Sequence, residues 1–408
     1  MFKFAALSTV FSLAVAASSN YLVVFGNSLS DIGNIDNVTY AVPWYNGRFS
    51  NGPVWNEYLA HTNNLTLINY AIGGAASNNT FVYDISGQNV TIPSAIDQIV
   101  LFNQTFGGKF SEDSIKNDIA VVEIGGNDFL YSASELATNS TDLNTFTDDL
   151  VEYIMNGVRM LYDMGYKKIL VTDISDLGVT PSILALSQTA SENVGDYVTA
   201  ANDKLSIAVA SYLKMYESDV DYIRVVDLYG FVKIVSEPTV SSALNITVTN
   251  APCYVTLNGT LVSSCSNSDE YLFMDTIHPS TKVHALTAAV ISEIISNSNF
   301  TLSQSVLLDL IDSYDIKDVS SNYNWLYKNY TNKTDLIITE YTIKEATANA
   351  KDLIQAQSSN GTSSNDNTSS SSSSLPISSS TLSKPSSSSK LYIMSVLSIF
   401  IPFLVMII

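Results

Sequence analysis

The sequence predicts an α/β fold in which a parallel sheet carries helices on both faces. Short apolar runs closely followed by glycine or aspartate predict its strands: residues 21–25, 65–70, 119–124, 168–172 and 221–226. Between them, residues 140–164 and 188–217 have apolar side chains at helical spacing. Such alternation is typical of a parallel sheet covered on both faces. Binding sites in these sheets lie at the carboxyl ends of the strands, so we expect functional residues in the turns after these runs.

The composition excludes several classes of protein. The chain has 408 residues, of which 46% are hydrophobic, enough for a sizeable core, and 14% are charged. Its formal net charge is −20, so nucleic acid is not an expected partner. The 2 cysteines and 3 histidines exclude a multi-cysteine metal cluster and a histidine-rich site. Chemistry that needs histidine must use His61, His278 or His284.

Both ends of the chain carry sorting patterns. Residues 1–17 hold a lysine, an apolar run and a small-x-small cleavage pattern, and predict a signal peptide rather than a buried helix. Residues 358–390 contain 18 serines and predict a solvated stalk. Residues 391–408 form an uncharged apolar run, which after a polar spacer predicts a glycosylphosphatidylinositol (GPI) anchor signal attached near Ser378 or Ser379. The alternative is a retained membrane helix.

The body of the chain has features of a secreted protein. It contains 13 Asn-x-Ser/Thr sequons, which together predict N-glycans. In an oxidising compartment Cys253 and Cys265 can form a disulfide; two free buried thiols are the alternative. We therefore expect the protein on the extracellular face of the plasma membrane or in the cell wall, with the outer leaflet as a partner through the lipid anchor.

The mature body divides at a helix predicted over residues 280–298. Residues 18–299 are expected to form the α/β domain. Residues 300–357 contain an aromatic-rich stretch and a helix-like run over 335–355. They are consistent with a helical appendage docked on the domain or with a spacer to the stalk, and the sequence leaves both open.

Two motifs near the borders of this domain carry groups for acyl transfer. Ser28 lies in the turn after the first predicted strand, where a following helix N-terminus favours developing negative charge; a serine N-cap is the alternative. Asp275 lies three residues before His278, just ahead of a predicted helix. An aspartate at this spacing can hold one imidazole nitrogen and leave the other to accept a serine proton. A loop histidine near a capping aspartate is the alternative.

Glycine-rich turns follow the second and third predicted strands, at Gly73-Gly74 and at Gly125-Gly126-Asn127-Asp128. Glycine lets the backbone approach a substrate, and an asparagine amide can donate to an oxyanion. The order of these motifs with Ser28 and Asp-x-x-His-Pro resembles the SGNH hydrolases, also called the GDSL lipase/esterase family, over about residues 21–298. Residues 47–55, 69–75 and 176–181 resemble its secreted fungal carbohydrate-esterase members.

The resemblance implies a fold, a mechanism and a role for each motif residue. The fold would be a three-layer α/β/α sandwich of the flavodoxin-like kind. Ser28 would be the nucleophile, His278 its general base and Asp275 the residue that orients His278. The N–H groups of Ser28 and Gly74 and the side chain of Asn127 would form the oxyanion hole. No metal or cofactor is needed.

One position departs from the family motif, because Asn27 stands where the family has aspartate directly before the serine. Since that aspartate transfers no proton, activity is expected to survive. The sequence favours a cell-surface esterase that hydrolyses short acyl groups, above all acetyl groups on carbohydrate. A lipase or phospholipase acting on membrane lipids and a non-catalytic wall protein with a degenerate site are the alternatives.

Overall fold

The computed structural model describes residues 20–35, 41–258 and 260–358. The predicted signal peptide at 1–17, the anchor signal at 391–408 and its attachment residue Ser378 lie outside these residues. The predicted stalk lies outside them except for Ser358. Within the described part of the chain, no helix combines the length and the apolar character needed to span a membrane.

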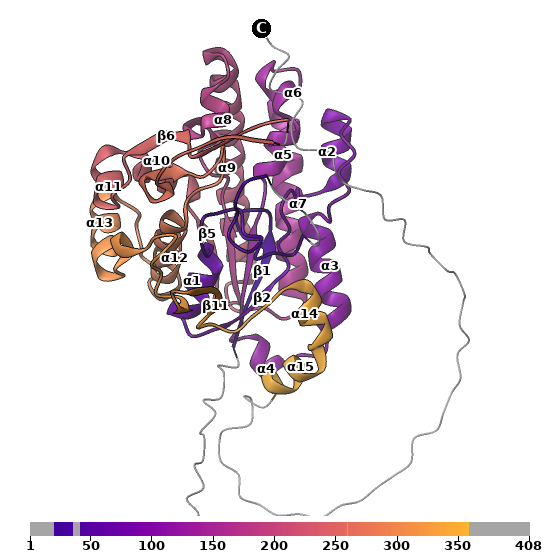
Figure 1. The fold of residues 1–408 in the computed structure, drawn as a ribbon. Helices are drawn as coiled ribbons and strands as arrows, with labels where there is room; N and C mark the ends of the chain where they lie inside the picture. The colour runs from indigo at the N-terminus through magenta and orange to yellow at the C-terminus, as the bar shows by residue number, and fades with distance from the viewer. Residues whose placement is uncertain (1–19, 36–40, 259, 359–408) are drawn as a thin grey trace, which may run out of the picture.

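A parallel sheet of six strands forms the centre of the molecule (Figure 1), in the order β12-β2-β1-β3-β4-β5. Strands β1 to β5, counted along the chain, confirm the five predicted apolar runs. β1 lies inside the sheet between β2 and β3, and Gly26 at its end pairs with Glu123 at the end of β3. The strands are β1 (Tyr21–Gly26), β2 (Thr66–Asn69), β3 (Ile119–Glu123), β4 (Lys168–Thr172), β5 (Tyr222–Val226) and β12 (Glu340–Tyr341).

Helices cover both faces of the sheet, because alternate residues of each strand point to opposite sides. Val23 and Phe25 pack in a core with α3, α7 and α9, whereas Leu22 and Val24 pack in a second core with α1 and α12. This arrangement confirms the predicted α/β/α layers. The longer helices are α1 (Trp55–Thr62), α2 (Asn79–Ser86), α3 (Ala95–Phe106), α7 (Leu143–Asp163), α9 (Gln188–Tyr216), α10 (Leu228–Ser236), α12 (Thr281–Ser296) and α13 (Gln304–Ser313). The shorter helices are α4 (Glu112–Ile115), α5 (Gly126–Tyr131), α6 (Ala133–Ala137), α8 (Pro181–Leu184), α11 (Pro238–Ala243), α14 (Ile343–Ala348) and α15 (Ala350–Ser358).

Three small two-stranded sheets lie outside the central one. β6 (Val248–Pro252) pairs with β9 (Tyr271–Phe273), and β10 (Tyr327–Asn329) pairs with β11 (Asn332–Leu336). β7 (Tyr254–Leu257) and β8 (Thr260–Ser264) form an antiparallel hairpin. A disulfide joins Cys253 to Cys265, one residue before and one after this hairpin. The hairpin therefore has a covalent clamp at its base.

Residues 300–357 are part of the same folded body. The helix-like run over 335–355 is helical only from Ile343 onward, because it contains the end of β11 and then β12 before the two helices α14 and α15. The break has a local cause, since Thr342 and Glu345 form a capping box that starts a helix only after β12. Leu307 packs in one core and Leu353 in the other, and β12 pairs with β2 in the central sheet. Of the two alternatives, these contacts fit an appendage docked on the α/β domain.

Candidate active site

Ser28 lies in a tight turn directly after β1. The carbonyl of Asn27 accepts the N–H groups of Ser30 and Asp31 at 3.1 and 3.0 Å, and its side-chain oxygen accepts that of Leu29 at 2.9 Å. The helix expected to begin after Ser28 is absent, because residues 29–35 form turns and bends. The N-cap alternative for Ser28 therefore does not apply. Hydrogen bonds within the turn, instead of a helix, hold this serine at the carboxyl edge of the sheet.

Asp275 and His278 lie in the loop between β9 and α12. One carboxylate oxygen of Asp275 accepts the backbone N–H groups of Ile277 and His278 at 2.8 and 2.7 Å. The other lies 2.7 Å from Nδ1 of the imidazole. The aspartate therefore fixes both the backbone and the ring of the histidine, as the Asp-x-x-His spacing predicts.

The histidine ring reaches back to the first turn. Nε2 of His278 lies 2.7 Å from Oγ of Ser28. Because Nδ1 faces a carboxylate, the neutral tautomer carries its proton there and leaves Nε2 as the acceptor for the serine hydroxyl. Ser28, His278 and Asp275 thus form a continuous hydrogen-bonded chain.

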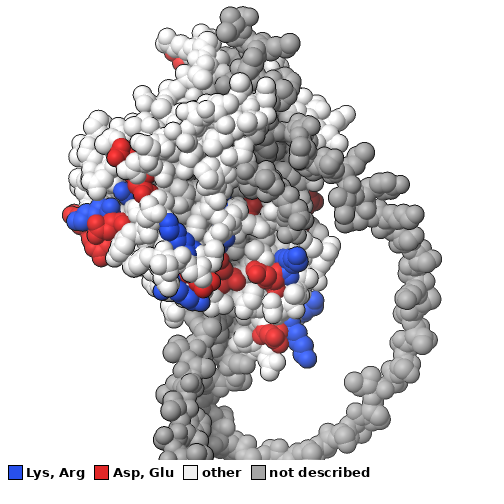
Figure 2. All heavy atoms as spheres, in the orientation of Figure 1, with Lys and Arg blue, Asp and Glu red and all other residues white. Residues whose placement is uncertain are grey.

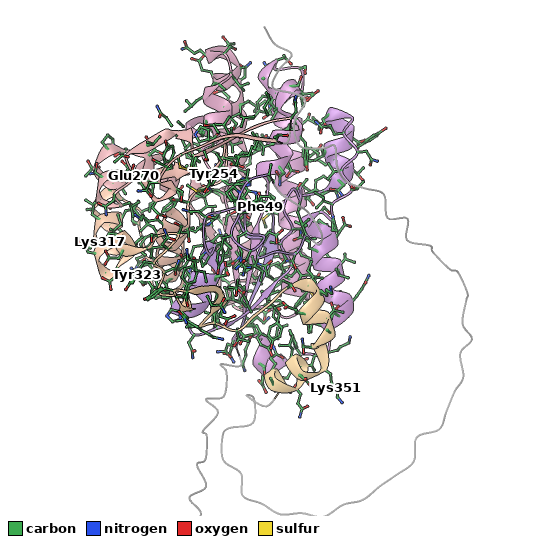
Figure 3. The ribbon with its side chains drawn as sticks, in the orientation of Figure 1. Phe49, Tyr254, Glu270, Lys317, Tyr323 and Lys351 are labelled. Carbon is green, nitrogen blue, oxygen red and sulfur yellow. A yellow bond between two sulfur atoms is a disulfide. The ribbon has the colours of Figure 1, made fainter. Side chains whose placement is uncertain are left out.

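The surroundings favour the charged form of the aspartate. Burial alone would raise the pKa of Asp275, but the neighbouring charge of His278 and hydrogen bonds from His278 and Ile277 hold it below the usual value. Phe49 packs on the imidazole with ring centroids 5.1 Å apart, and Trp44 meets it edge to face at 5.8 Å. Figure 3 labels Phe49 and Tyr254, which both contact Trp44 in this part of the molecule.

The predicted oxyanion-hole residue Gly74 lies in the turn after β2, and Asn127 lies in the first turn of α5, which follows β3. Asn127 donates an amide hydrogen to the carbonyl of Ala75 at 2.8 Å, and the hydroxyl of Tyr131 donates to the carbonyl of Gly74 at 2.9 Å. Gly74 has φ +84°, and a Cβ there would lie 2.6 Å from Ile92. A side chain at this position would therefore be strained by the positive φ, and the end of the Ile92 side chain would have to shift to make room for it. These contacts tie the two turns together.

A cavity of about 100 Å³ lies beside Ser28. Asn127 and His278 line it together with Ser28, and its remaining wall comes largely from apolar side chains of α10, α12 and the strand ends. Apolar residues of this wall include Ile174, Leu177, Phe231, Val232, Val283 and Ile291. The geometry therefore offers an apolar group a place next to the serine hydroxyl.

Two buried groups in this region escaped the sequence reasoning. His284 is 2% exposed and lines the cavity, because residues of α12 are buried on every side. Burial and the charge of His278 lower the pKa of His284 to about 3. Glu123 is also buried and contacts Asn27. Its signal in the sequence was a single charged residue inside an otherwise apolar predicted strand.

Comparison with known proteins finds similar sequences and one similar solved structure. The chain is 26% identical over 295 residues to a thermolabile hemolysin of Vibrio parahaemolyticus, across 68% of this chain and 64% of the hemolysin. It is 25% identical over 357 residues to a GDSL esterase/lipase of Arabidopsis thaliana, across 73% of this chain and 93% of that protein. A lipase structure from a goat rumen metagenome has a TM-score of 0.38 at 12% identity, covering 69% of this chain and 98% of the lipase.

A family model supplies the decisive match. The model described as GDSL-like lipase/acylhydrolase aligns with residues 22–291, from β1 to α12. This range contains the serine turn, both glycine-rich turns and the Asp-x-x-His loop. The chain belongs to the GDSL-like lipase/acylhydrolase family, a family of ester-hydrolysing serine hydrolases.

Proposed function

We propose that the protein hydrolyses carboxylic esters with short acyl chains through an acyl intermediate on Ser28. The single observation that carries this proposal is the hydrogen-bonded chain from Ser28 through His278 to Asp275 at the carboxyl edge of the sheet. This is the arrangement that activates a serine hydroxyl in unrelated hydrolases.

Each residue then has one role in two half-reactions. The hydroxyl oxygen of Ser28 attacks the ester carbonyl carbon while His278 accepts the hydroxyl proton at Nε2. Asp275 stabilises the imidazolium, and donors from Ser28, Gly74 and Asn127 stabilise the oxyanion. The intermediate expels the alcohol, which takes the proton from His278. A water molecule then repeats the sequence, releasing the carboxylic acid and restoring the serine.

The size of the cavity supports a short acyl chain. A cavity of about 150 Å³ lined by apolar side chains holds benzene, and the cavity beside Ser28 measures about 100 Å³. It therefore suits an acyl group of a few carbons and leaves unused space around an acetyl group. The half-buried rings of Trp44 and Tyr254 near His278 are suited to the apolar face of a sugar as the alcohol part.

Hydrolysis of lipid acyl esters is the second candidate. The apolar character of the cavity wall favours it, as does the word lipase in the names of the family and of the Arabidopsis relative. On the face shown in Figure 2, charged side chains gather mainly in the lower half, and the described surface above them is largely uncharged.

Ester panels separate these candidates. Purified protein and its Ser28→Ala variant are assayed with p-nitrophenyl acetate, butyrate, octanoate and dodecanoate, and with acetylated oligosaccharides and phospholipid vesicles. The proposal expects the highest kcat/KM on butyrate and loss of activity in the variant. A maximum at octanoate or longer favours the lipid candidate. Equal rates for both proteins on every ester would defeat the proposed mechanism.

We further propose that the protein is a GPI-anchored glycoprotein at the cell surface. Nine of the ten described sequon asparagines are exposed, which supports N-glycosylation: Asn64, Asn89, Asn103, Asn139, Asn245, Asn258, Asn299, Asn329 and Asn332. Phosphatidylinositol-specific phospholipase C is expected to release the protein from intact cells. Retention after this treatment, with an intact C-terminal epitope in the cytosol, would instead indicate a membrane helix.

A further inference from the structure

The turn that holds Ser28 rests on a buried pair, Asn27 and Glu123. Both side chains are 3% exposed. The amide nitrogen of Asn27 donates to Oε1 of Glu123 at 2.9 Å, and the hydroxyl of Ser30 donates to Oε2 at 2.8 Å. Trp55 donates its indole N–H to the same hydroxyl at 3.0 Å. The carboxylate therefore accepts hydrogen bonds from both sides of the nucleophile.

The backbone makes this contact possible. Gly26 pairs with Glu123 across the parallel strands, and a Cβ at Gly26 would lie 2.5 Å from the carbonyl oxygen of Glu123 and 3.0 Å from its carboxylate. Without a side chain there, the end of β3 comes close enough for its carboxylate to reach under the turn. The side-chain oxygen of Asn27 remains free to accept the N–H of Leu29 at 2.9 Å.

An aspartate at position 27 does not fit this arrangement. Its second oxygen would take the place of the amide nitrogen and lie about 3 Å from Oε1 of Glu123, where two carboxylates cannot both be ionised. The carboxylate of Glu123 in the third strand therefore explains why position 27 holds asparagine instead of the family aspartate. The asparagine in turn gives that carboxylate a hydrogen-bond donor. The negative charge has not been lost from the site, because it stands on the neighbouring strand.

We propose that Glu123 is the positioning residue of the nucleophile turn, and that Asn27 and Glu123 form an exchangeable amide–carboxylate pair that replaces the family aspartate. The pair fixes the direction of the Ser28 hydroxyl and N–H by holding the side chains on either side of it. This inference rests on the proposed function of Ser28. It also predicts that the pair stabilises the fold, which can be tested without a substrate.

The electrostatic surroundings agree with a carboxylate held by neutral partners. Burial raises the pKa of Glu123 to about 7, and hydrogen bonds from Ser30 and Asn27 act against that rise. Titratable side chains from the neighbouring elements that share the cavity with Glu123 are Asp173, Asp176, His278 and His284. A second carboxylate at position 27 would lie closer to Glu123 than any of these titratable groups.

A double-mutant cycle tests the pair. The proteins are the wild type, Asn27→Asp, Glu123→Gln and the double variant, assayed on p-nitrophenyl butyrate between pH 6 and pH 10. In the double variant a glutamine amide donates to the new carboxylate, so the hydrogen bond is kept with its polarity reversed. A second carboxylate raises the pKa of the pair above the value of about 7 that Glu123 has beside the neutral amide. Asn27→Asp alone is therefore expected to lower kcat about 10- to 100-fold at pH 10, where both carboxylates are ionised and the nucleophile is displaced. Relative to wild type, it should recover at pH 7 and below, where the two carboxylates share a proton.

The rescue decides between positioning and a general loss of structure. The double variant is expected to regain most of the lost kcat and to lose the relative pH dependence, so the two substitutions are strongly non-additive. Asn202→Asp is the matched control, since it also creates a buried carboxylate, beside the carbonyl of Ile174. Glu123→Gln should not rescue that control. Additive losses in the double variant, or an Asn27→Asp protein as active as wild type at pH 10, would overturn the proposal.

The cycle also separates the two proposals from each other. If wild type hydrolyses no ester on the panel, the proposed function fails. The same four proteins are then compared by their melting temperatures. Asn27→Asp should melt lowest at pH 10 and the double variant should recover. If the melting temperatures instead fall additively, the pair is rejected whatever the activity.

Discussion

The hydroxyl oxygen of Ser28 lies 2.7 Å from Nε2 of His278, although 250 positions separate the two residues. β1 delivers the serine to the middle of the sheet edge, and the start of α12 delivers the histidine. Between them, the segment from Ser50 to Asn51 holds the histidine loop. Ser50 donates to the carbonyl of Pro279 at 3.0 Å, and Asn51 accepts the N–H of Thr281 at 2.9 Å. A third segment of the chain, residues 50–51, therefore helps to hold the hydroxyl of Ser28 and the imidazole of His278 in contact.

Asp275→Asn tests the role of the aspartate. The substitution keeps the shape but can turn the imidazole to the wrong tautomer and removes the charge that stabilises the imidazolium. We expect kcat to fall about 10³- to 10⁴-fold with little change in KM. Steady-state assays on p-nitrophenyl butyrate measure both constants. Asp227→Asn is a matched control outside this loop, and a loss below tenfold in Asp275→Asn would contradict the assigned role.

Asn51→Ala tests the support of the histidine loop. Asn51 accepts the first N–H of α12, one of the donors that a helix leaves unpaired at its start. Its loss should loosen the loop and lower kcat about tenfold or more, since small displacements of reacting groups are costly. Asn63→Ala removes a contact between α1 and Ser292 instead and should leave kcat near the wild-type value. Equal effects of the two substitutions would show that only general stability is involved.

The sequence predicted the parts of this site that depend on local pattern. Each strand and the polar turn after it are continuous in the chain, so Ser28, Asn127 and His278 could be proposed from motif order alone. The contact between Glu123 and Asn27 depends on the register of β1 against β3, which no local pattern reveals. β12 was missed for a related reason. A two-residue edge strand has too few residues to show any periodicity, and its place beside β2 is fixed by long-range contacts such as the ion pair between Arg48 and Glu340 at 2.7 Å.

Val232→Phe tests whether the cavity selects the acyl chain. Val232 is half-buried in α10 and lines the cavity, so a larger side chain should occupy space that a butyryl group needs. Each methylene that no longer fits costs about 1–3 kcal/mol in discrimination. The ratio of kcat/KM for butyrate over acetate should therefore fall about tenfold or more. Val262→Phe, on the exposed hairpin strand β8, is the control that should leave this ratio unchanged. If the ratio falls equally in both variants, the cavity does not select the acyl chain.

The pH dependence of stability follows from buried carboxyl groups. Burial is the largest cause that raises the pKa of Asp118, Glu123, Asp128 and Asp173 to about 7 in the folded protein. Between the ordinary pKa of a carboxyl group and about 7, the folded state binds more protons than the unfolded state, so stability falls as pH rises. Asp275 and His284 have lowered pKa values and act in the opposite direction, but the four raised carboxyl groups outnumber them.

We therefore expect the melting temperature to be higher near pH 5 than near pH 8, as measured by differential scanning calorimetry. Asp128→Asn tests one contributor, because Asp128 accepts hydrogen bonds from the backbone and the hydroxyl of Ser77 in a fully buried place. An amide oxygen can accept the same bonds without a titrating proton. The variant should lose less stability than the wild type between pH 5 and pH 8. Asp149→Asn, at an exposed position in α7, is the control that should keep the wild-type slope. A wild-type melting temperature that rises steadily from pH 5 to pH 8 would contradict the assignment of these carboxyl groups.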